Sequence, residues 1–208
     1  MHQRCAETAR TRQPRVKQGI LAISGSIRTG SVNAQLLRAV SALAADELDV
    51  MIWDELAQVP PFTPDADLLP ESVRSLRAAI ATCDALLISS PEYNFSVPGQ
   101  LKNAIDWASH PIADSPFAGK PTAVIGASSD PASEANWARS DLRRILGVVG
   151  ARIVGPDLLV LRADEAFAAD GRLPEHEHAL LDVLRELRSA VHDRGLTEDS
   201  RSRAATGN

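Results

Sequence analysis

Residues 90–99 read Ser-Pro-Glu-Tyr-Asn-Phe-Ser-Val-Pro-Gly and decide how the chain folds. The apolar run Ala85-Leu86-Leu87-Ile88 precedes them and has the length of a buried strand. Pro91 ends that strand because proline cannot donate to a sheet ladder. Pro98 fixes φ and lacks the N–H that a first helical turn leaves unpaired, so we expect a helix to begin there, with one apolar face formed by Leu101, Ala104, Ile105 and Ala108. In an open parallel sheet, a rigid loop at the carboxyl end of a strand is where ligands bind.

The rest of the chain repeats this alternation of strand and helix. Apolar runs predict strands at 20–23, 48–53, 85–88, 122–125 and 152–161, the last one interrupted by Gly155-Pro156. Helical spacing of apolar residues predicts helices near 32–46, 73–80, 98–110, 142–149 and 180–191. Five strands alternating with five helices specify a doubly wound α/β sandwich with right-handed crossovers.

The length of 208 residues and the apolar content of 44% suit one domain with a substantial core. We expect this domain over 19–192. A basic, aperiodic extension at 1–18 and a polar tail at 193–208 are interpreted as disordered, and a transit peptide at the start is a less favoured alternative.

The net charge of −5 argues against a partner such as nucleic acid or a membrane surface. No apolar run approaches the roughly 18 residues of a membrane helix, and no secretory signal opens the chain. These features predict a cytoplasmic protein that acts on small molecules. Cys5 and Cys83 fit no metal spacing, so we interpret Cys83 as a small core residue and Cys5 as a free thiol.

The loop at residues 24–31, between the first strand and the first helix, has the composition of an anion site. Main-chain N–H groups and the positive end of a helix dipole converge there. Ser26 and Ser31 add hydroxyls, and a guanidinium at Arg28 can bind two phosphate oxygens at once. Asn33 adds an amide. The alternative is a plain helix cap at Ser31 with a solvated arginine.

Two familiar nucleotide motifs do not match this loop. Ser31 stands where a nucleotide-triphosphatase loop requires lysine, and the glycines do not form G-x-G-x-x-G. Asp54, after the second strand, only superficially resembles the acid that binds a ribose in dinucleotide folds. A monophosphate therefore fits better than a pyrophosphate.

The loop at 25–33 reads Gly-Ser-Ile-Arg-Thr-Gly-Ser-Val-Asn and resembles the G-S-x-R-x-x-S-x-N phosphate loop of the NAD(P)H-dependent FMN reductase family. Residues 91–107 resemble the long signature P-E-Y-N-x-x-x-P-x-x-L-K-N-A-I-D-W of the same family, which includes chromate, quinone and azo-dye reductases. With Lys120-Pro121, the resemblance covers about residues 19–161. It implies a flavodoxin-like three-layer sandwich with a five-stranded parallel sheet of order 2-1-3-4-5, assembled as a homodimer or homotetramer.

The resemblance also implies the chemistry. FMN would take hydride from NADPH or NADH and pass electrons to free flavin, a quinone, an azo compound or a metal oxyanion. Matched by position, the residues that would hold the FMN phosphate are Ser26, Arg28, Ser31 and Asn33. Those that would line the ribityl chain and the ring are Pro91, Glu92, Tyr93, Asn94 and Ser128. No catalytic side chain and no metal are expected.

One segment departs from the family pattern. Relatives commonly have a glycine-rich stretch after the fourth strand, whereas residues 129–137 contain no glycine. An FMN-binding sensor or electron carrier with poor turnover is therefore the alternative function. A phosphate-ester or nucleotide-processing enzyme is a weaker third reading.

Several side chains keep two interpretations. Glu92 is a general acid or, as we favour, an acceptor for a backbone or partner-subunit donor. Trp137 stacks near the flavin or, as we favour, packs as a buried staple. Asp106 and Trp107 are expected on a dimer surface. His176 and His178 do not share a helical face, which favours a solvated turn over a metal site.

Three arginines leave the nucleotide preference open. They can meet the 2′-phosphate of NADPH or face water, and they are Arg139, Arg143 and Arg144.

Overall fold

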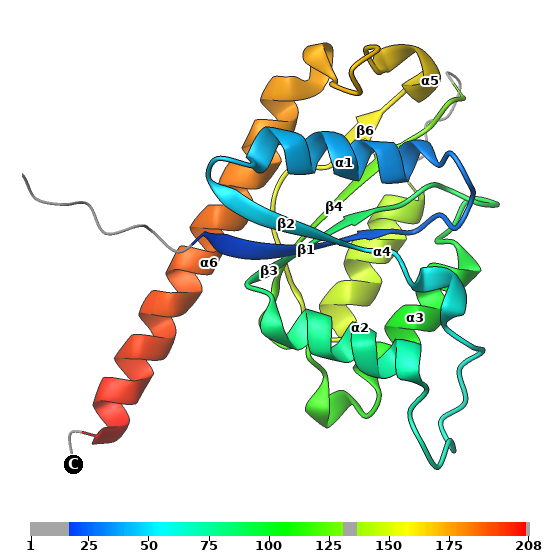
Figure 1. Ribbon diagram of the computed structural model, residues 1–208. Helices are drawn as coiled ribbons and strands as arrows, with labels where there is room; N and C mark the ends of the chain where they lie inside the picture. The colour runs from blue at the N-terminus through cyan, green and yellow to red at the C-terminus, as the bar shows by residue number, and fades with distance from the viewer. Residues whose placement is uncertain (1–16, 131–136, 207–208) are drawn as a thin grey trace, which may run out of the picture.

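A single parallel sheet organises the molecule in the computed structural model, which describes residues 17–130 and 137–206 (Figure 1). Its strands are β1 (Gln18–Ser24), β2 (Leu48–Trp53), β3 (Ala85–Ser89), β4 (Pro121–Ala127), β5 (Arg152–Ile153) and β6 (Leu158–Val160). The order is β2-β1-β3-β4-β5, and β6 also pairs with β4. The predicted flavodoxin-like order 2-1-3-4-5 is confirmed.

The interruption predicted in the last strand is also present. β5 pairs with the start of β4, and β6 pairs with its end. Gly155 lies between them with a φ of +76°, a conformation that favours glycine. One interrupted strand therefore supplies both short pieces beside β4.

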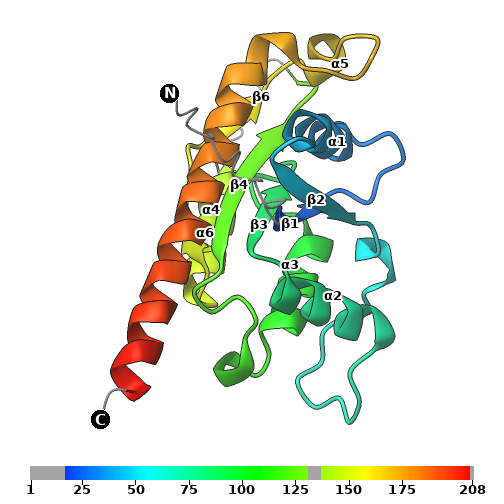
Figure 2. The ribbon, with the colours of Figure 1, turned by 60° about the vertical axis from the view of Figure 1, so that its left-hand side comes forward.

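In the described part of the chain, six helices lie against the sheet (Figures 1 and 2). They are α1 (Val32–Ala44), α2 (Glu71–Thr82), α3 (Gly99–Ser109), α4 (Trp137–Val148), α5 (Ala163–Ala166) and α6 (Glu177–Thr206). Single 3₁₀ turns lie at Leu56–Gln58, Ile112–Asp114 and Pro174–His176. Helices α2, α3 and α4 share one hydrophobic cluster, and α1 and α6 share the other.

Successive residues along a strand belong alternately to the two hydrophobic clusters. In β3, Leu86 and Ile88 belong to the cluster beneath α2, α3 and α4, whereas Ala85 and Leu87 belong to the one beneath α1 and α6. Successive strand residues point to opposite faces, and a parallel sheet covered on both faces buries both sets. This is why the strands read as continuous apolar runs rather than alternating ones.

The structure differs from the sequence interpretation at the end of the chain and at two tryptophans. The segment from residue 193 onward continues α6 to Thr206. It lacks an apolar stripe but also lacks proline, so helix propensity extends the helix. Trp137 opens α4 and is 67% exposed, so it is not a buried staple. Trp107 is buried rather than on a dimer surface: its Nε1 donates to the Pro60 carbonyl at 2.8 Å, because the proline-rich crossover folds back over α3.

Cys83 is a partly buried residue packed against the core, as predicted. Burial raises the pKa of its thiol, so the side chain is uncharged at neutral pH. Cys5 and the extension up to residue 16 lie outside the described residues. None of the helices in the described ranges combines the length and apolar character of a membrane crossing.

A substitution at Gly126 tests how tightly the carboxyl end of β4 packs against the segment after β3. A Cβ there would lie 2.9 Å from the Ser90 carbonyl oxygen, which is main chain and cannot move cheaply. We expect Gly126→Ala to lower the free energy of unfolding by about 1–3 kcal/mol, measured by urea denaturation. The control is Gly147→Ala in α4, where a Cβ meets nothing within 4 Å; it should raise stability by up to about 1 kcal/mol. Equal effects of the two changes would contradict the packing argument.

Candidate functional site

A cleft lies where the sequence predicted ligand binding, at the carboxyl ends of β1, β3 and β4. Its volume is about 260 Å³, and it is lined by Ser26, Arg28, Ser31, Val32, Asn33, Pro91, Glu92, Tyr93, Ala127, Ser128 and Ser129. The structure therefore brings together every predicted site residue except Asn94, which adjoins the lining residue Tyr93 in the chain.

The loop after β1 is held close to β3. The Gly25 N–H donates to the Ser89 carbonyl at 2.8 Å. A Cβ on Gly25 would lie 2.9 Å from Leu101 and 3.1 Å from the Ser90 hydroxyl, so only glycine fits without displacing neighbours. This close approach directs residues 26–31 across the ends of the strands.

The amino end of α1 opens onto the cleft. Ser31 caps the helix: its Oγ accepts from the Ala34 N–H at 3.3 Å. Ser26 Oγ accepts from the Arg28 N–H at 3.3 Å. The Arg28 side chain is exposed and makes no ion pair with any residue in the described ranges. A helix terminus, two hydroxyls and a free guanidinium suit an anion with several oxygens.

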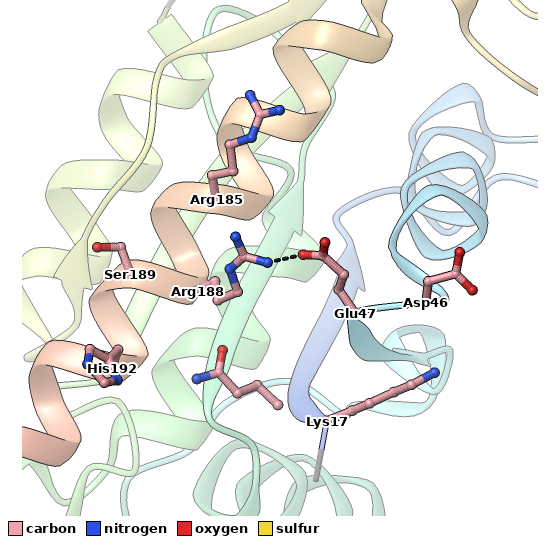
Figure 3. Close-up of a pocket in the computed structure, with 8 residues that line it drawn as sticks. Lys17, Asp46, Glu47, Arg185, Arg188, Ser189 and His192 are labelled. Atoms are coloured by element: carbon pink, nitrogen blue, oxygen red, sulfur yellow. Dashed lines mark hydrogen bonds and ion pairs between the residues drawn. The ribbon is translucent and has the colours of Figure 1, made fainter. Parts of the chain in front are cut away.

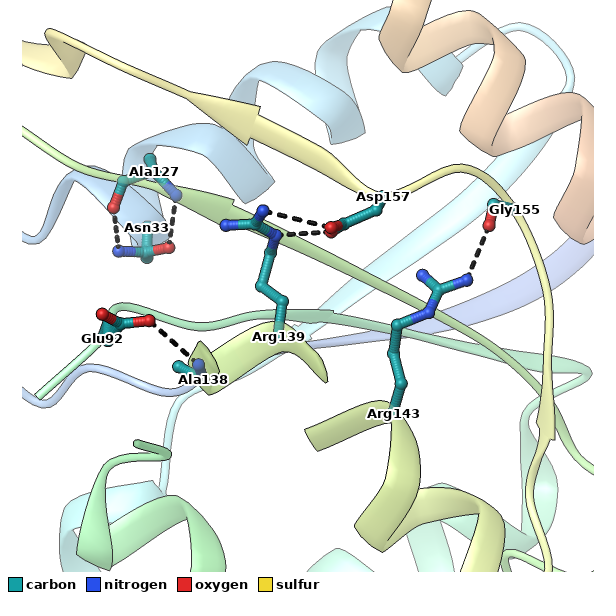
Figure 4. A network of polar contacts seen from close by, with 8 residues as sticks. All are labelled: Asn33, Glu92, Ala127, Ala138, Arg139, Arg143, Gly155 and Asp157. Atoms are coloured by element: carbon teal, nitrogen blue, oxygen red, sulfur yellow. Dashed lines mark hydrogen bonds and ion pairs between the residues drawn. The ribbon is translucent and has the colours of Figure 1, made fainter. Parts of the chain in front are cut away.

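Asn33 has a structural bonding pattern that the sequence did not predict (Figure 4). Its Nδ2 donates to the Ala127 carbonyl at 2.9 Å, and its Oδ1 accepts from the Ala127 N–H at 2.9 Å. The same Oδ1 accepts from the Ser89 hydroxyl at 2.8 Å. The side chain is 1% exposed. It therefore joins α1 to the ends of β3 and β4, and its side-chain amide is already bonded within the protein.

The loop after β3 contains a tight two-residue turn. Tyr93 and Ser96 exchange two main-chain hydrogen bonds of 3.1 Å each. Between them, Asn94 has a φ of +51° and Phe95 a φ of +59°. Asparagine tolerates this region, whereas for phenylalanine it is uncommon and strained. Strain of this kind clusters at ligand clamps, which supports a functional reading of the loop.

Tyr93 links this loop to the one after β1. Its hydroxyl lies 3.4 Å from Ser26 Oγ, and its side chain is 48% exposed. The two sides of the cleft therefore meet at this pair, and the phenol ring stays accessible to a ligand.

Glu92 is an acceptor for a backbone donor, as favoured above. Its Oε2 accepts from the Ala138 N–H at 3.0 Å, in the first turn of α4 (Figure 4). A carboxylate at a helix N-terminus is stabilised by the helix dipole. A second hydrogen bond joins the loop to α4: Ser96 Oγ donates to Asp141 Oδ2 at 3.3 Å. Both contacts hold the loop after β3 against α4.

The three arginines of α4 are used within the protein. Arg139 is 5% exposed and pairs with Asp157 through contacts of 2.5 and 3.1 Å (Figure 4). Arg143 donates to the Gly155 carbonyl at 2.8 Å. Arg144 pairs with Asp141 at 3.4 Å. Arg139 and Arg143 therefore fix α4 to the β5–β6 connection instead of projecting towards a nucleotide.

Ser128 is anchored through its main chain. Its N–H donates to the Val160 carbonyl at 2.9 Å, and its carbonyl accepts from the Ala163 N–H at 3.0 Å. Its Oγ accepts from the Asp130 N–H at 3.2 Å. The loop 129–137, singled out for its missing glycines, lies largely outside the described residues, since 131–136 are not described.

A larger cavity of about 630 Å³ lies at the opposite, amino end of β1 (Figure 3). Four of its charged side chains already have partners on the protein. Arg188 pairs with Glu47, Arg185 pairs with Asp182 at 2.7 Å, and Lys17 donates to a main-chain carbonyl. In doubly wound sheets ligands bind at the carboxyl ends of the strands, so the cleft over β1, β3 and β4 is the candidate site. No group of three or more potential metal ligands gathers among residues 17–130 and 137–206.

Comparison with known proteins agrees with this geometry. A family model described as NADPH-dependent FMN reductase matches residues 19–165. The NAD(P)H-dependent FMN reductase PA1204 of Pseudomonas aeruginosa is 39% identical over 157 residues, covering 74% of this chain and 83% of that protein. A 2-hydroxy-1,4-benzoquinone reductase of a Burkholderia species is 37% identical over 148 residues, covering 71% and 80%. The solved structure of FerB, a flavoenzyme NAD(P)H:(acceptor) oxidoreductase of Paracoccus denitrificans, has a TM-score of 0.72 and 33% identity, covering 84% of this chain and 96% of that one.

Removing the Asn33 side-chain amide should lower the stability of the folded protein, because this amide connects α1 to the ends of β3 and β4. Asn33→Ala leaves the N–H and carbonyl of Ala127 and the hydroxyl of Ser89 without this partner. We expect a loss of about 1–3 kcal/mol in the free energy of unfolding for each buried group left unpaired, measured by urea denaturation. The control Gln35→Ala removes only an exposed 3.2 Å contact with the Gly30 carbonyl and should change stability by less than about 1 kcal/mol. Similar losses in both variants would show that Asn33 does not tie the strand ends together.

Proposed function

Because the chain belongs to the NADPH-dependent FMN reductase family, we propose that its cleft binds FMN and that the protein is an FMN-dependent oxidoreductase. It takes hydride from NADPH or NADH, the co-substrate, and passes electrons to a second small molecule. The observation that carries this function is the convergence of Ser26, Arg28, Ser31, Tyr93 and Ser128 on one cleft at the carboxyl ends of β1, β3 and β4.

The donor set of the cleft suits the FMN phosphate. Ser26 and Arg28 would bind its oxygens, together with main-chain N–H groups in the first turn of α1. Ser31 contributes as the cap that fixes this turn. Asn33 would act through its main-chain N–H, since its side chain is bonded to Ala127 and Ser89.

The rest of the cleft suits the ribityl chain and the ring. Pro91, Tyr93 and Ser128 would line them, with Glu92 holding the loop to α4. The turn at Asn94 would present main-chain N–H groups to the polar edge of the ring, because its positive φ reverses the chain within two residues. When bound, FMN supplies the hydride and electron chemistry. The residues of the chain bind and orient it.

The electron acceptor is proposed to be a quinone first, with free flavin, azo compounds and metal oxyanions as further candidates. Several relatives are named for quinones, among them the benzoquinone reductase described above and a quinone reductase of Escherichia coli, 38% identical over 113 residues. Phe95 and Trp137 are 76% and 67% exposed in the loop after β3 and at the start of α4. Exposed aromatic rings suit a planar apolar acceptor.

We also propose that the protein assembles into homo-oligomers in the cytoplasm. A homodimer or homotetramer would cover exposed apolar side chains such as Ile112 and Val148. A cytoplasmic location remains the expectation from charge and composition.

The direct test is an absorbance spectrum of the protein after incubation with FMN and desalting, followed by anaerobic addition of NADPH or NADH. A retained flavin band that bleaches with either nucleotide is the expected result. A retained band that does not bleach would favour the sensor or electron carrier. If saturating FMN failed to bind, the proposed function would fall.

Arg28 should contribute strongly to FMN affinity. Arg28→Ala removes a charge-assisted contact worth on the order of 1.5–3 kcal/mol, so the dissociation constant of FMN should rise about tenfold or more. Quenching of flavin fluorescence on titration measures this constant. The matched control is Arg144→Ala, which removes an exposed arginine that pairs with Asp141. Unchanged affinity in Arg28→Ala would remove Arg28 from the phosphate site.

A further inference from the structure

A second cleft lies on the other side of the loop that follows β1. Its volume is about 200 Å³, and it is lined by Ser24, Ser26, Ile27, Arg28, Thr29, Ala34, Arg38, Ile52, Trp53, Asp54, Leu56 and Ala57. It lies at the carboxyl ends of β1 and β2, beside α1. Ser26 and Arg28 line both clefts, so the second cleft adjoins the proposed FMN phosphate site.

Two unpaired charges of opposite sign face this second cleft. Arg38 is exposed on α1, one helical turn after Ala34, and Asp54 is exposed directly after β2. Within the described ranges neither side chain makes a hydrogen bond or an ion pair. They differ in this from Arg139, Arg143 and Arg144, each of which has a partner on the protein. A guanidinium and a carboxylate that are both free in one cleft are available to a ligand.

The remaining lining is apolar and hydroxylic. Ile27 is 59% exposed, and Ile52 and Leu56 complete an apolar wall. Ser24 and Thr29 add hydroxyls. An apolar wall suits the face of a purine base. The Arg38 guanidinium and the Asp54 carboxylate suit a phosphorylated sugar.

We propose that this second cleft binds the adenosine 2′-phosphate end of NADPH, with Arg38 as the residue that selects NADPH over NADH. This assignment rests on the proposed function, because it names a subsite for the hydride donor. Arg38 would take the 2′-phosphate oxygens through its planar guanidinium. Asp54 would accept a hydrogen bond from the neighbouring 3′-hydroxyl of the same ribose, because an ionised carboxylate is an acceptor for hydroxyl donors.

The charges decide between the two nucleotides. NADH has a hydroxyl in place of the 2′-phosphate, so it would leave the Arg38 cation without its anionic partner. Arg28 cannot substitute for Arg38, because it lies on the wall shared with the FMN phosphate site and is needed there. Arg38 is therefore the guanidinium of this cleft that stays available for a second phosphate, so the cleft favours a phosphate over a hydroxyl.

The test measures binding directly on protein saturated with FMN, so that the phosphate site is filled. Calorimetric titrations compare adenosine 2′,5′-bisphosphate with adenosine 5′-monophosphate. We expect the wild-type protein to bind the bisphosphate at least about tenfold more tightly, the size of one charge-assisted contact, and Arg38→Ala to lose that preference. Arg38→Lys should restore part of it, because the charge returns without the planar fork. The ratio of KM for NADPH to KM for NADH should rise by the same factor in Arg38→Ala.

The control variant is Arg74→Ala, which removes an exposed arginine of α2 that pairs with Glu71 and should keep the wild-type preference. Equal binding of the two probes by the wild-type protein would overturn the assignment, as would an unchanged preference in Arg38→Ala. Either result alongside normal bleaching of bound FMN would contradict only this assignment. Failure of FMN to bind or to be reduced by either nucleotide would contradict the proposed function instead.

Discussion

The paired hydrogen bonds between the Asn33 side chain and the main chain of Ala127 hold the site together. The amide satisfies both polar groups of one peptide position at the end of β4 and also accepts from Ser89 at the end of β3. A buried amide with three partners has one orientation, because turning it would leave donors facing donors. The amino end of α1 is therefore fixed over the strand ends, and the helix terminus that would bind phosphate is preorganised.

The loops that follow β1 and β3 contact each other, and the loop after β3 also contacts α4. Tyr93 meets Ser26 across the cleft, and Glu92 caps α4. The buried Arg139 pairs with Asp157 and anchors α4 to the β5–β6 connection. Truncating one partner of such a pair leaves a buried charge, so pairs of this kind fix geometry more than they add stability. The protein thus supplies a rigid, polar frame, and a flavin supplies the redox chemistry.

The strand and helix order was predictable because buried parallel strands read as short apolar runs and helices as amphipathic periods. The loop residues were predictable from their resemblance to a family motif. The contacts between segments that are distant in the sequence were not predictable. Nothing local shows that Asn33 reaches Ala127, that the crossover covers Trp107, or that Arg139 is buried against Asp157. Each depends on where distant segments meet, and a periodic pattern carries no such information. The extension of α6 was missed because we interpreted the absence of an apolar stripe as disorder.

A crystal structure of the FMN complex would show directly whether the cleft over β1, β3 and β4 holds the cofactor. We expect the phosphate over Ser26, Arg28 and the first turn of α1, with the ring against the turn at Tyr93–Asn94. The Asn33 amide should remain bonded to Ala127. A phosphate bound instead beside Arg38 and Asp54, or at the amino end of β1, would show that the cleft over β1, β3 and β4 is not the FMN site.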